Sequence, residues 1–281
     1  MIQLIMLSKM EGSSGIWIVD SHTHAFPDSL ASRAMEALKA LDGNHPSYSD
    51  GTIEGLKGSM DMAGISRAWV MPVATKPSQV RSINDWAKEV SDDRIAAFGA
   101  LHPDLEDWEG EISRIKSLGL PGVKMHPDYQ DFLPDDPKMF PMYDALRAEG
   151  LILFLHAGDD IAFQRPGYGS PERIAKVLRE FPGLKVVAAH LGGFRMWDAV
   201  EEHLVGRDVL LETSFSFAHT ACSQIERIIK KHGTERILFG TDSPWKDQRV
   251  EVGNIFSLRL PDREIEMILG RNAEELLRDY L

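Results

Sequence analysis

Short apolar runs alternate with helix-compatible stretches eight times along this chain of 281 residues. Continuous apolar runs separated by helices are typical of parallel strands that are buried on both faces. Eight such units at this length predict a single closed (β/α)₈ barrel of the TIM type, an α/β fold. The predicted strands lie at residues 16–19, 68–71, 95–101, 122–125, 151–155, 184–189, 209–212 and 237–240. The predicted helices lie at residues 29–41, 52–63, 77–90, 105–118, 138–149, 171–181, 194–205, 219–232 and 261–281.

The segment 16–281 is expected to form one domain, because no linker or low-complexity tract interrupts it. An open doubly wound sheet is the alternative, but no glycine-rich phosphate loop follows the first predicted strand. Residues 1–15 are expected to be a lead-in that is either disordered or an additional strand. Its apolar part is too short to cross a membrane.

The composition narrows the class of partner. A formal net charge of −12 argues against a nucleic-acid binder, which needs a basic surface, and against docking on anionic membranes. Cys222 is the one cysteine, so no disulfide can form within the chain, as is usual in the reducing cytoplasm. We therefore expect a cytoplasmic protein that acts on a small molecule, either as a monomer or as a homo-oligomer.

Two histidines follow the first predicted strand. His22 and His24 are two residues apart, so on an extended chain their imidazoles point to the same side. Such a pair can bind one metal ion. Taken alone, such a pair is more often two hydrogen-bonded core histidines than a metal site. Further residues elsewhere in the sequence are therefore needed to support metal binding.

Further histidines gather at one end of the predicted strands. Six of the ten histidines stand at carboxyl ends, namely His22, His24, His102, His126, His156 and His190. In a (β/α)₈ barrel the active site lies at that end. Asp242 follows the last strand, where a buried carboxylate needs a cation or hydrogen-bond donors. A salt bridge with Lys246 is the alternative for Asp242, and His102 and His126, which precede prolines, can simply line the mouth.

Six short segments carry a family resemblance. They are DSHTH at 20–24, GVKMHP at 122–127, LHAG at 155–158, AHLGG at 189–193, FGTDSP at 239–244 and GRNA at 270–273. In this order they resemble the amidohydrolase superfamily of metal-dependent hydrolases, in the branch that also contains aminocarboxymuconate-semialdehyde decarboxylase. The resemblance extends from Ile18 to Leu277.

The resemblance implies a role for each matching residue. The metal ligands that it implies are His22, His24, His156 and Asp242. They would hold one divalent ion, expected to be zinc, with a two-ion site as the alternative. Asp242 would also move a proton. His190 would be a catalytic group in a one-metal site or a ligand of the second ion in a two-metal site.

Basic residues recur in the segments that follow the strand ends, although the chain is acidic overall. Such cations would hold a carboxylated substrate by charge-assisted hydrogen bonds. The expected substrate-binding residues are Lys124, His126, Arg165 and Lys246. Arg165 lies in a loop long enough to act as a lid. The alternative to substrate binding is that Arg165 forms an ion pair with a nearby acidic residue. Lys124 matches a lysine that is carboxylated in some superfamily members, but we expect it to be uncarboxylated, because it shares a strand face with His126.

The expected reaction is hydrolysis of an amide, ester or lactone by metal-activated water, with Asp242 accepting the proton and His190 polarising the carbonyl. A metal-dependent decarboxylase of an aromatic or unsaturated carboxylic acid is the alternative. The chain is shorter than the decarboxylating relatives, which favours hydrolysis. A binding protein that keeps the metal without the chemistry is a third possibility, and the presence of Asp242 and His190 argues against it.

Overall fold

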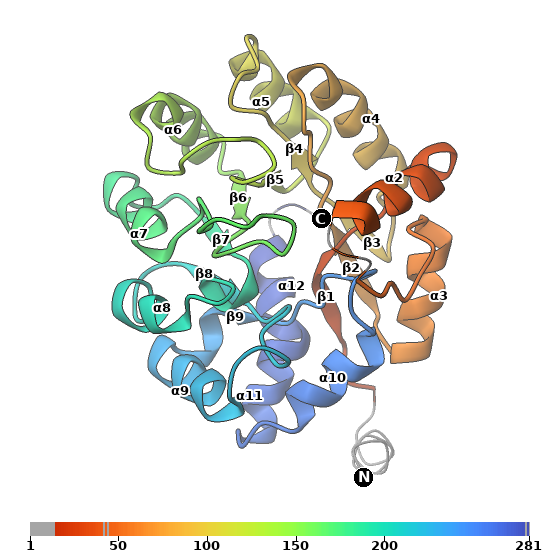
Figure 1. The fold of residues 1–281 in the computed structure, drawn as a ribbon, viewed down its shortest axis with the longest axis vertical. Coiled ribbons are helices and arrows are strands. Elements are labelled where there is room, and N and C mark those ends of the chain that lie inside the picture. The colour runs from red at the N-terminus through yellow and green to blue at the C-terminus, as the bar shows by residue number, and fades with distance from the viewer. Residues whose placement is uncertain (1–14, 42, 44, 279, 281) are drawn as a thin grey trace.

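The computed structural model describes residues 15–41, 43, 45–278 and 280, so most of the predicted lead-in, residues 1–14, lies outside the described part. Parallel strands surround a central axis in Figure 1. They are β1 (Val19–Thr23), β2 (Arg67–Val70), β3 (Ile95–Ala97), β4 (Gly99–Ala100), β5 (Gly122–Met125), β6 (Ile152–Leu155), β7 (Val186–Ala188), β8 (Leu210–Glu212) and β9 (Ile237–Leu238). β3 and β4 together are the third predicted strand, which is interrupted at Phe98.

Backbone hydrogen bonds join two strand sets into a barrel. Regular parallel pairing runs from β1 to β3 and from β4 to β9. Between the sets, the amide of Phe98 donates to the carbonyl of Val70 at 2.9 Å. At the other seam, the amide of Ser21 donates to the carbonyl of Phe239 at 2.8 Å. The amide of Asp242 donates to the carbonyl of His22 at 2.7 Å. The predicted (β/α)₈ barrel is therefore confirmed.

Most helices form an outer layer around the strands, whereas α11 (Asp262–Glu266) and α12 (Asn272–Leu277) cross behind the strands at the centre of Figure 1. The other helices are α2 (Asp28–Leu41), α3 (Ile53–Ala63), α4 (Val80–Val90), α5 (Trp108–Ser117), α6 (Phe140–Ala148), α7 (Pro171–Glu180), α8 (Trp197–His203), α9 (Cys222–His232) and α10 (Gln248–Phe256). The sequence did not predict α10. The predicted last helix is divided into α11, a π-helical stretch at Met267–Arg271, and α12.

Local chemistry sets the helix boundaries. At the start of α3, the hydroxyl of Thr52 accepts a hydrogen bond from the amide of Gly55 at 2.9 Å. Gly64 ends the same helix in the left-handed conformation, with φ of 70°, which glycine adopts without a steric cost. Within the described residues, no helix is both long and apolar enough to cross a bilayer.

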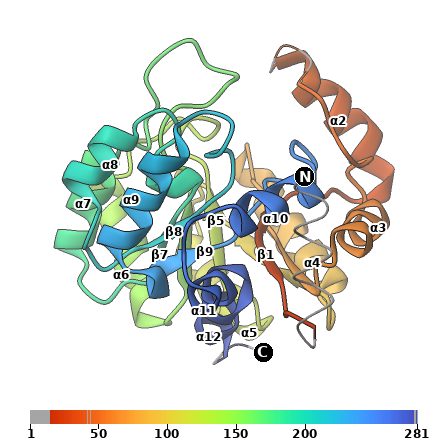
Figure 2. The ribbon, with the colours of Figure 1, turned by 90° about the horizontal axis from the view of Figure 1, so that it is seen from below.

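Strand side chains fill two apolar layers. Trp69, Phe98 and Phe154 belong to the cluster inside the barrel, to which α12 contributes Ala273 and Leu277. Figure 2 shows α12 at the opposite end of the molecule from the long loop that follows β6. The other strand faces pack against the helices in a second cluster. Because apolar side chains fill the barrel interior, most buried polar groups of the strands, among them His22, Lys124 and Glu212, lie toward the carboxyl ends.

Candidate metal centre and active site

The two histidines of the first strand lie beside the aspartate that follows β9. His22 is 1% exposed and Asp242 is 9% exposed. Asp242 Oδ1 lies 3.0 Å from His24 Nε2 and 3.4 Å from His22 Nε2. Ligand atoms of these three residues all lie within 4.8 Å of one another. The structure thus brings together three of the four expected metal ligands.

The protonation states of this group fit a divalent cation. Burial, together with the charge of Lys124, lowers the pKa of His22 to about 4, so its imidazole is neutral at pH 7. Burial alone would raise the pKa of Asp242, but His22 and His24 outweigh it and hold that pKa well below its usual value. Neutral imidazoles and an ionised carboxylate are the forms that bind a metal ion. The donor chemistry therefore fits a divalent metal ion.

His156 and His190, which follow β6 and β7, lie against each other. His190 Nε2 is 3.0 Å from His156 Nδ1, and His190 Nδ1 is 2.8 Å from Ser214 Oγ. Burial lowers the pKa of both imidazoles. His156, the fourth expected ligand, is not part of the group that contains Asp242. Its Nε2 lies 3.0 Å from the carbonyl oxygen of Asp159 instead.

Lys124 extends from β5 into the same region. Its side chain is buried, with Nζ 3.2 Å from His22 Nε2 and 4.5 Å from the centroid of the Phe154 ring. Burial lowers the pKa of Lys124 to about 8, although the carboxylates of Asp242 and Glu212 favour its charged form. An amine with this pKa is still mainly protonated at pH 7. It therefore supplies a positive charge next to the candidate ligands.

His126 and His102 have different surroundings. His126 stacks on His156 with ring centroids 3.9 Å apart, and its Nε2 lies 3.3 Å from Asp160 Oδ2. His126 therefore lines the same region as the other histidines. His102 instead accepts a hydrogen bond at Nδ1 from the amide of Asp104, at 3.1 Å, so its contact belongs to the turn after β4.

The two expected substrate cations in the loops have defined neighbours. Arg165 Nη1 lies 2.7 Å from Asp128 Oδ1, and its guanidinium carbon lies 3.5 Å from the centroid of the Tyr168 ring. Arg165 thus has an acidic partner, as the alternative for this residue anticipated. Lys246 Nζ lies 4.4 Å from the centroid of the Phe215 ring. Lys246 therefore contacts an aromatic face and does not form the salt bridge with Asp242 that was the alternative interpretation of Asp242.

Sequence reasoning missed Glu212, the last residue of β8. Its carboxylate is fully buried, and Oε1 lies 2.8 Å from His22 Nδ1. Oε1 also accepts from the hydroxyl of Ser214 at 2.6 Å and from the amide of His190 at 2.8 Å. Burial alone would raise the pKa of Glu212, but His22 and these donors lower it to about 2. The signal was present in the sequence, because an acid that ends an apolar run is the same pattern that identified Asp242.

Strained backbone marks the same end of the barrel. His190, Leu191 and Asp242 have left-handed φ values of 58°, 54° and 62°. Non-glycine residues in this region cost about 1–3 kcal/mol each and cluster at functional sites. Two of these three residues are candidate site residues, so the strain and the buried polar groups point to the same place.

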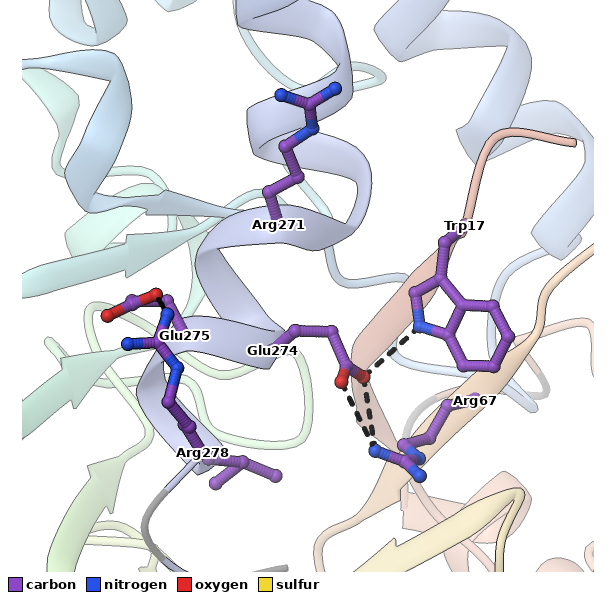
Figure 3. Close-up of a pocket in the computed structure, with 7 residues that line it drawn as sticks. Trp17, Arg67, Arg271, Glu274, Glu275 and Arg278 are labelled. Carbon is purple, nitrogen blue, oxygen red and sulfur yellow. Dashed lines mark hydrogen bonds and ion pairs between the residues drawn. The ribbon is translucent and has the colours of Figure 1, made fainter. Parts of the chain in front are cut away.

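A surface pocket of about 700 Å³ lies at the other end of the barrel (Figure 3). Trp17 and Arg67, from the amino ends of the first two strands, line it together with residues of α12. Glu274 accepts hydrogen bonds from both Trp17 and Arg67, and Arg278 pairs with Glu275. Except for Arg271, which pairs with Glu266, the polar side chains of the pocket bind one another, and the pocket contains none of the candidate site residues.

Comparison with known proteins identifies the family. The model of the Amidohydro_2 family, described as amidohydrolase, matches residues 19–278. The chain belongs to this family. A search of curated proteins returns no match.

Several solved structures share the fold. 5-Carboxyvanillate decarboxylase from Sphingomonas paucimobilis is 19% identical, with a TM-score of 0.70 over 94% of this chain and 99% of that one. 2,6-Dihydroxybenzoate decarboxylase, in complex with 2,6-dihydroxybenzoate, is 18% identical, with a TM-score of 0.70 over 93% and 99%. A mutant 5-carboxyvanillate decarboxylase from Novosphingobium aromaticivorans, with bound manganese, is 16% identical, with a TM-score of 0.72 over 95% and 98%.

These structures correct the expectation of hydrolysis. Each of the three is a decarboxylase, so the hydrolase interpretation of this family member was wrong. The physical reason is that three histidines and an aspartate around a metal suit either reaction. Chain length, which favoured hydrolysis, carries no chemical information, since this chain aligns with nearly the whole of each decarboxylase.

Proposed function

We propose that this protein is a metal-dependent decarboxylase that acts on a small aromatic or unsaturated carboxylic acid. The observation that carries the proposal is the convergence of His24 with the buried side chains of His22 and Asp242, beside the amine of Lys124. Such a set can hold a divalent ion and an anionic substrate at the same place. The activities named for structures of the same fold support decarboxylation.

The proposed metal ligands are His22, His24, His156 and Asp242, for one zinc or manganese ion per chain. His156 is included because its ring centroid lies 4.7 Å from that of His190, which in turn lies 5.3 Å from that of His22. The bound ion would hold oxygen atoms of the substrate and offset the negative charge that develops as the carbon–carbon bond breaks.

The protein's own residues would orient the acid and transfer one proton. The proposed substrate-binding residues are Lys124, His126, Arg165 and Lys246. Asp242 is ionised at rest, so it would first take a proton from a hydroxyl group of the substrate or from water and then give it to the carbon that loses CO₂. The electron pair of the broken carbon–carbon bond ends in the new carbon–hydrogen bond. His190 Nε2 is the second group that can accept a proton in this step.

Product analysis in D₂O tests the proposal. Metal-loaded protein would be incubated with hydroxybenzoic and unsaturated carboxylic acids, and the products examined by NMR and by CO₂ release. We expect CO₂ from at least one acid, one deuterium on the carbon that carried the carboxylate, and no turnover by metal-free protein. Failure of every acid in the panel, with metal bound, would contradict decarboxylation. Binding of an acid without turnover would indicate the metal-retaining binding protein instead.

A further inference from the structure

We propose that Glu212 is a positioning residue that fixes which nitrogen of three histidines carries the proton, and that it thereby leaves Nε2 of His22 and of His156 free to bind the metal. Glu212 contacts His22 directly and reaches His190 and His156 through the hydroxyl of Ser214. The assignment of protons rests on hydrogen-bond geometry alone. Its consequence for metal binding rests on the proposed function.

The two oxygens of Glu212 both act as acceptors. Oε1 accepts from the amide of His190 and Oε2 accepts from the amide of Ser214, each at 2.8 Å. The hydroxyl of Ser214 lies 2.6 Å from Oε1, so its single hydrogen points at the carboxylate. His22 Nδ1 lies 2.8 Å from Oε1 and must therefore donate. A neutral imidazole that donates from Nδ1 carries its lone pair on Nε2.

The lone pair of His22 is thus directed away from Glu212. His22 Nε2 lies 3.4 Å from Asp242 Oδ1, within the candidate metal group. A carboxylate that accepts from the far nitrogen of a metal-binding histidine fixes the ring orientation and raises the basicity of the ligand. Glu212 therefore makes Nε2 the ligand nitrogen of His22.

The same logic extends through Ser214. Because its hydrogen is committed to Glu212, the oxygen of Ser214 can only accept from His190 Nδ1, at 2.8 Å. His190 Nε2 then has the lone pair and accepts from His156 Nδ1, at 3.0 Å. His156 in turn has its lone pair on Nε2, which is the form of a metal ligand.

The contact of His156 Nε2 is the exception to this proton order. The atom lies 3.0 Å from the carbonyl oxygen of Asp159, which can only accept, so this contact favours Nε2–H on His156 and competes with the order that Glu212 sets. A cation bound at Nε2 would replace that proton and leave Nδ1–H to donate to His190. One buried carboxylate on β8 thus sets the ligand nitrogens of histidines from β1 and from the loop after β6.

Nitrogen-15 NMR of histidine-labelled protein tests this proton order directly, because the two ring tautomers have different nitrogen shifts and couplings. In the wild type without metal we expect Nδ1–H on His22 and His190, and after Zn²⁺ is added on His156 as well. Ser214→Ala should leave His22 unchanged and release His190 of the metal-free protein from a single tautomer. Ser216→Ala is the matched control, because the buried hydroxyl of Ser216 donates to the carbonyl of Thr213 and not to Glu212.

Metal titration supplies the second readout. Glu212→Gln should weaken Zn²⁺ binding by about 10–100-fold, the usual effect of losing the partner of a ligating histidine. Ser216→Ala should not change it. If Glu212→Gln does not fold, the NMR comparison of the two serine variants still decides. Nε2–H on His190 in the wild type, or no change of tautomer in Ser214→Ala, would overturn the inference. A protein with the expected tautomers and Zn²⁺ affinity but no CO₂ release would keep this inference and lose only the proposed function.

Discussion

Lys124 is the residue whose chemistry depends most on its surroundings. Its amine is buried between an imidazole of the candidate metal group and the face of Phe154. Burial lowers the pKa of Lys124 to about 8, so a modest change of environment decides its charge near neutral pH. An uncarboxylated lysine that is mainly protonated can contact an anionic substrate, whereas a carboxylated lysine would bridge two metal ions.

Replacement of Lys124 separates these two roles. We predict that Lys124→Ala loses about 100-fold in activity, the scale for removing one charge that stabilises a transition state. Added bicarbonate or a short carboxylate should not restore the activity, and the metal content should stay at one ion per chain. Elemental analysis and rate measurements with and without the additives provide the check. Clear rescue, with a fall from two ions to one, would show that Lys124 is carboxylated.

Individual site residues were predictable to the extent that they ended an apolar run. His22, His156 and Asp242 were found by this rule; in the structure His22 lies within β1, His156 directly follows β6, and Asp242 lies in the segment after β9. Glu212 ends β8 in the same way but was overlooked, because no neighbouring histidine drew attention to it. The pairing of Arg165 with Asp128 could not be predicted, since it joins loops that follow two different strands.

At the scale of elements, the loop after β6 holds the arginine expected at the mouth. The guanidinium of Arg165 is shared between Asp128 and the ring of Tyr168, so a bound acid has to compete with Asp128 for it. We predict that Arg165→Ala raises KM for a carboxylated substrate about tenfold more than for a neutral analogue, about 1.4 kcal/mol for one charge-assisted contact. Steady-state kinetics on both compounds give the answer. Equal effects would mean that Arg165 only holds the loop in shape.

Two glycines test the packing of helical elements. Gly270 lies in the π-helical stretch before α12, where an added Cβ would collide with the carbonyl oxygen of Trp17. Gly58 is on the exposed face of α3, where a Cβ would meet nothing within 4 Å. We predict that Gly270→Ala destabilises the fold by about 1–3 kcal/mol, as overpacking does, and that Gly58→Ala stabilises it by about 0.5–1 kcal/mol. Thermal unfolding of both variants measures the difference, and a stabilised Gly270→Ala would contradict the contact.

The strands were more predictable than the helices at the end of the chain. Continuous apolar runs identified the barrel strands from the second onward, because these are buried on both faces. The first strand, predicted at 16–19, instead forms at Val19–Thr23 and consists mainly of polar residues. α10 was missed because it has no simple apolar stripe. Its buried residues include Gln248, Glu251 and Gly253 beside Val252 and Ile255, so its pattern is that of a helix covered on several sides. The division between α11 and α12 could not be predicted, because the amphipathic repeat of the predicted helix 261–281 continues without interruption.

At the scale of the whole molecule, the expected site residues lie at one end of the barrel. Figure 2 shows α12 at one end, and α2 and the loop after β6 rising at the other. The end with the loop after β6 holds every expected catalytic and metal-binding residue, whereas the charged side chains at the α12 end line the pocket of Figure 3. A chain with a net charge of −12 that places Lys124 inside the end with the loop after β6 directs a positive charge toward an incoming anion.

Elemental analysis of the purified and reconstituted protein tests the central claim most directly. We predict about one zinc or manganese ion per chain in the wild type, almost none in His22→Ala, and one ion retained in His190→Ala, which should lose activity. The matched pair of histidine variants separates loss of a ligand from loss of a catalytic group. No bound divalent metal in the wild type after reconstitution, or full metal retention in His22→Ala, would contradict the account.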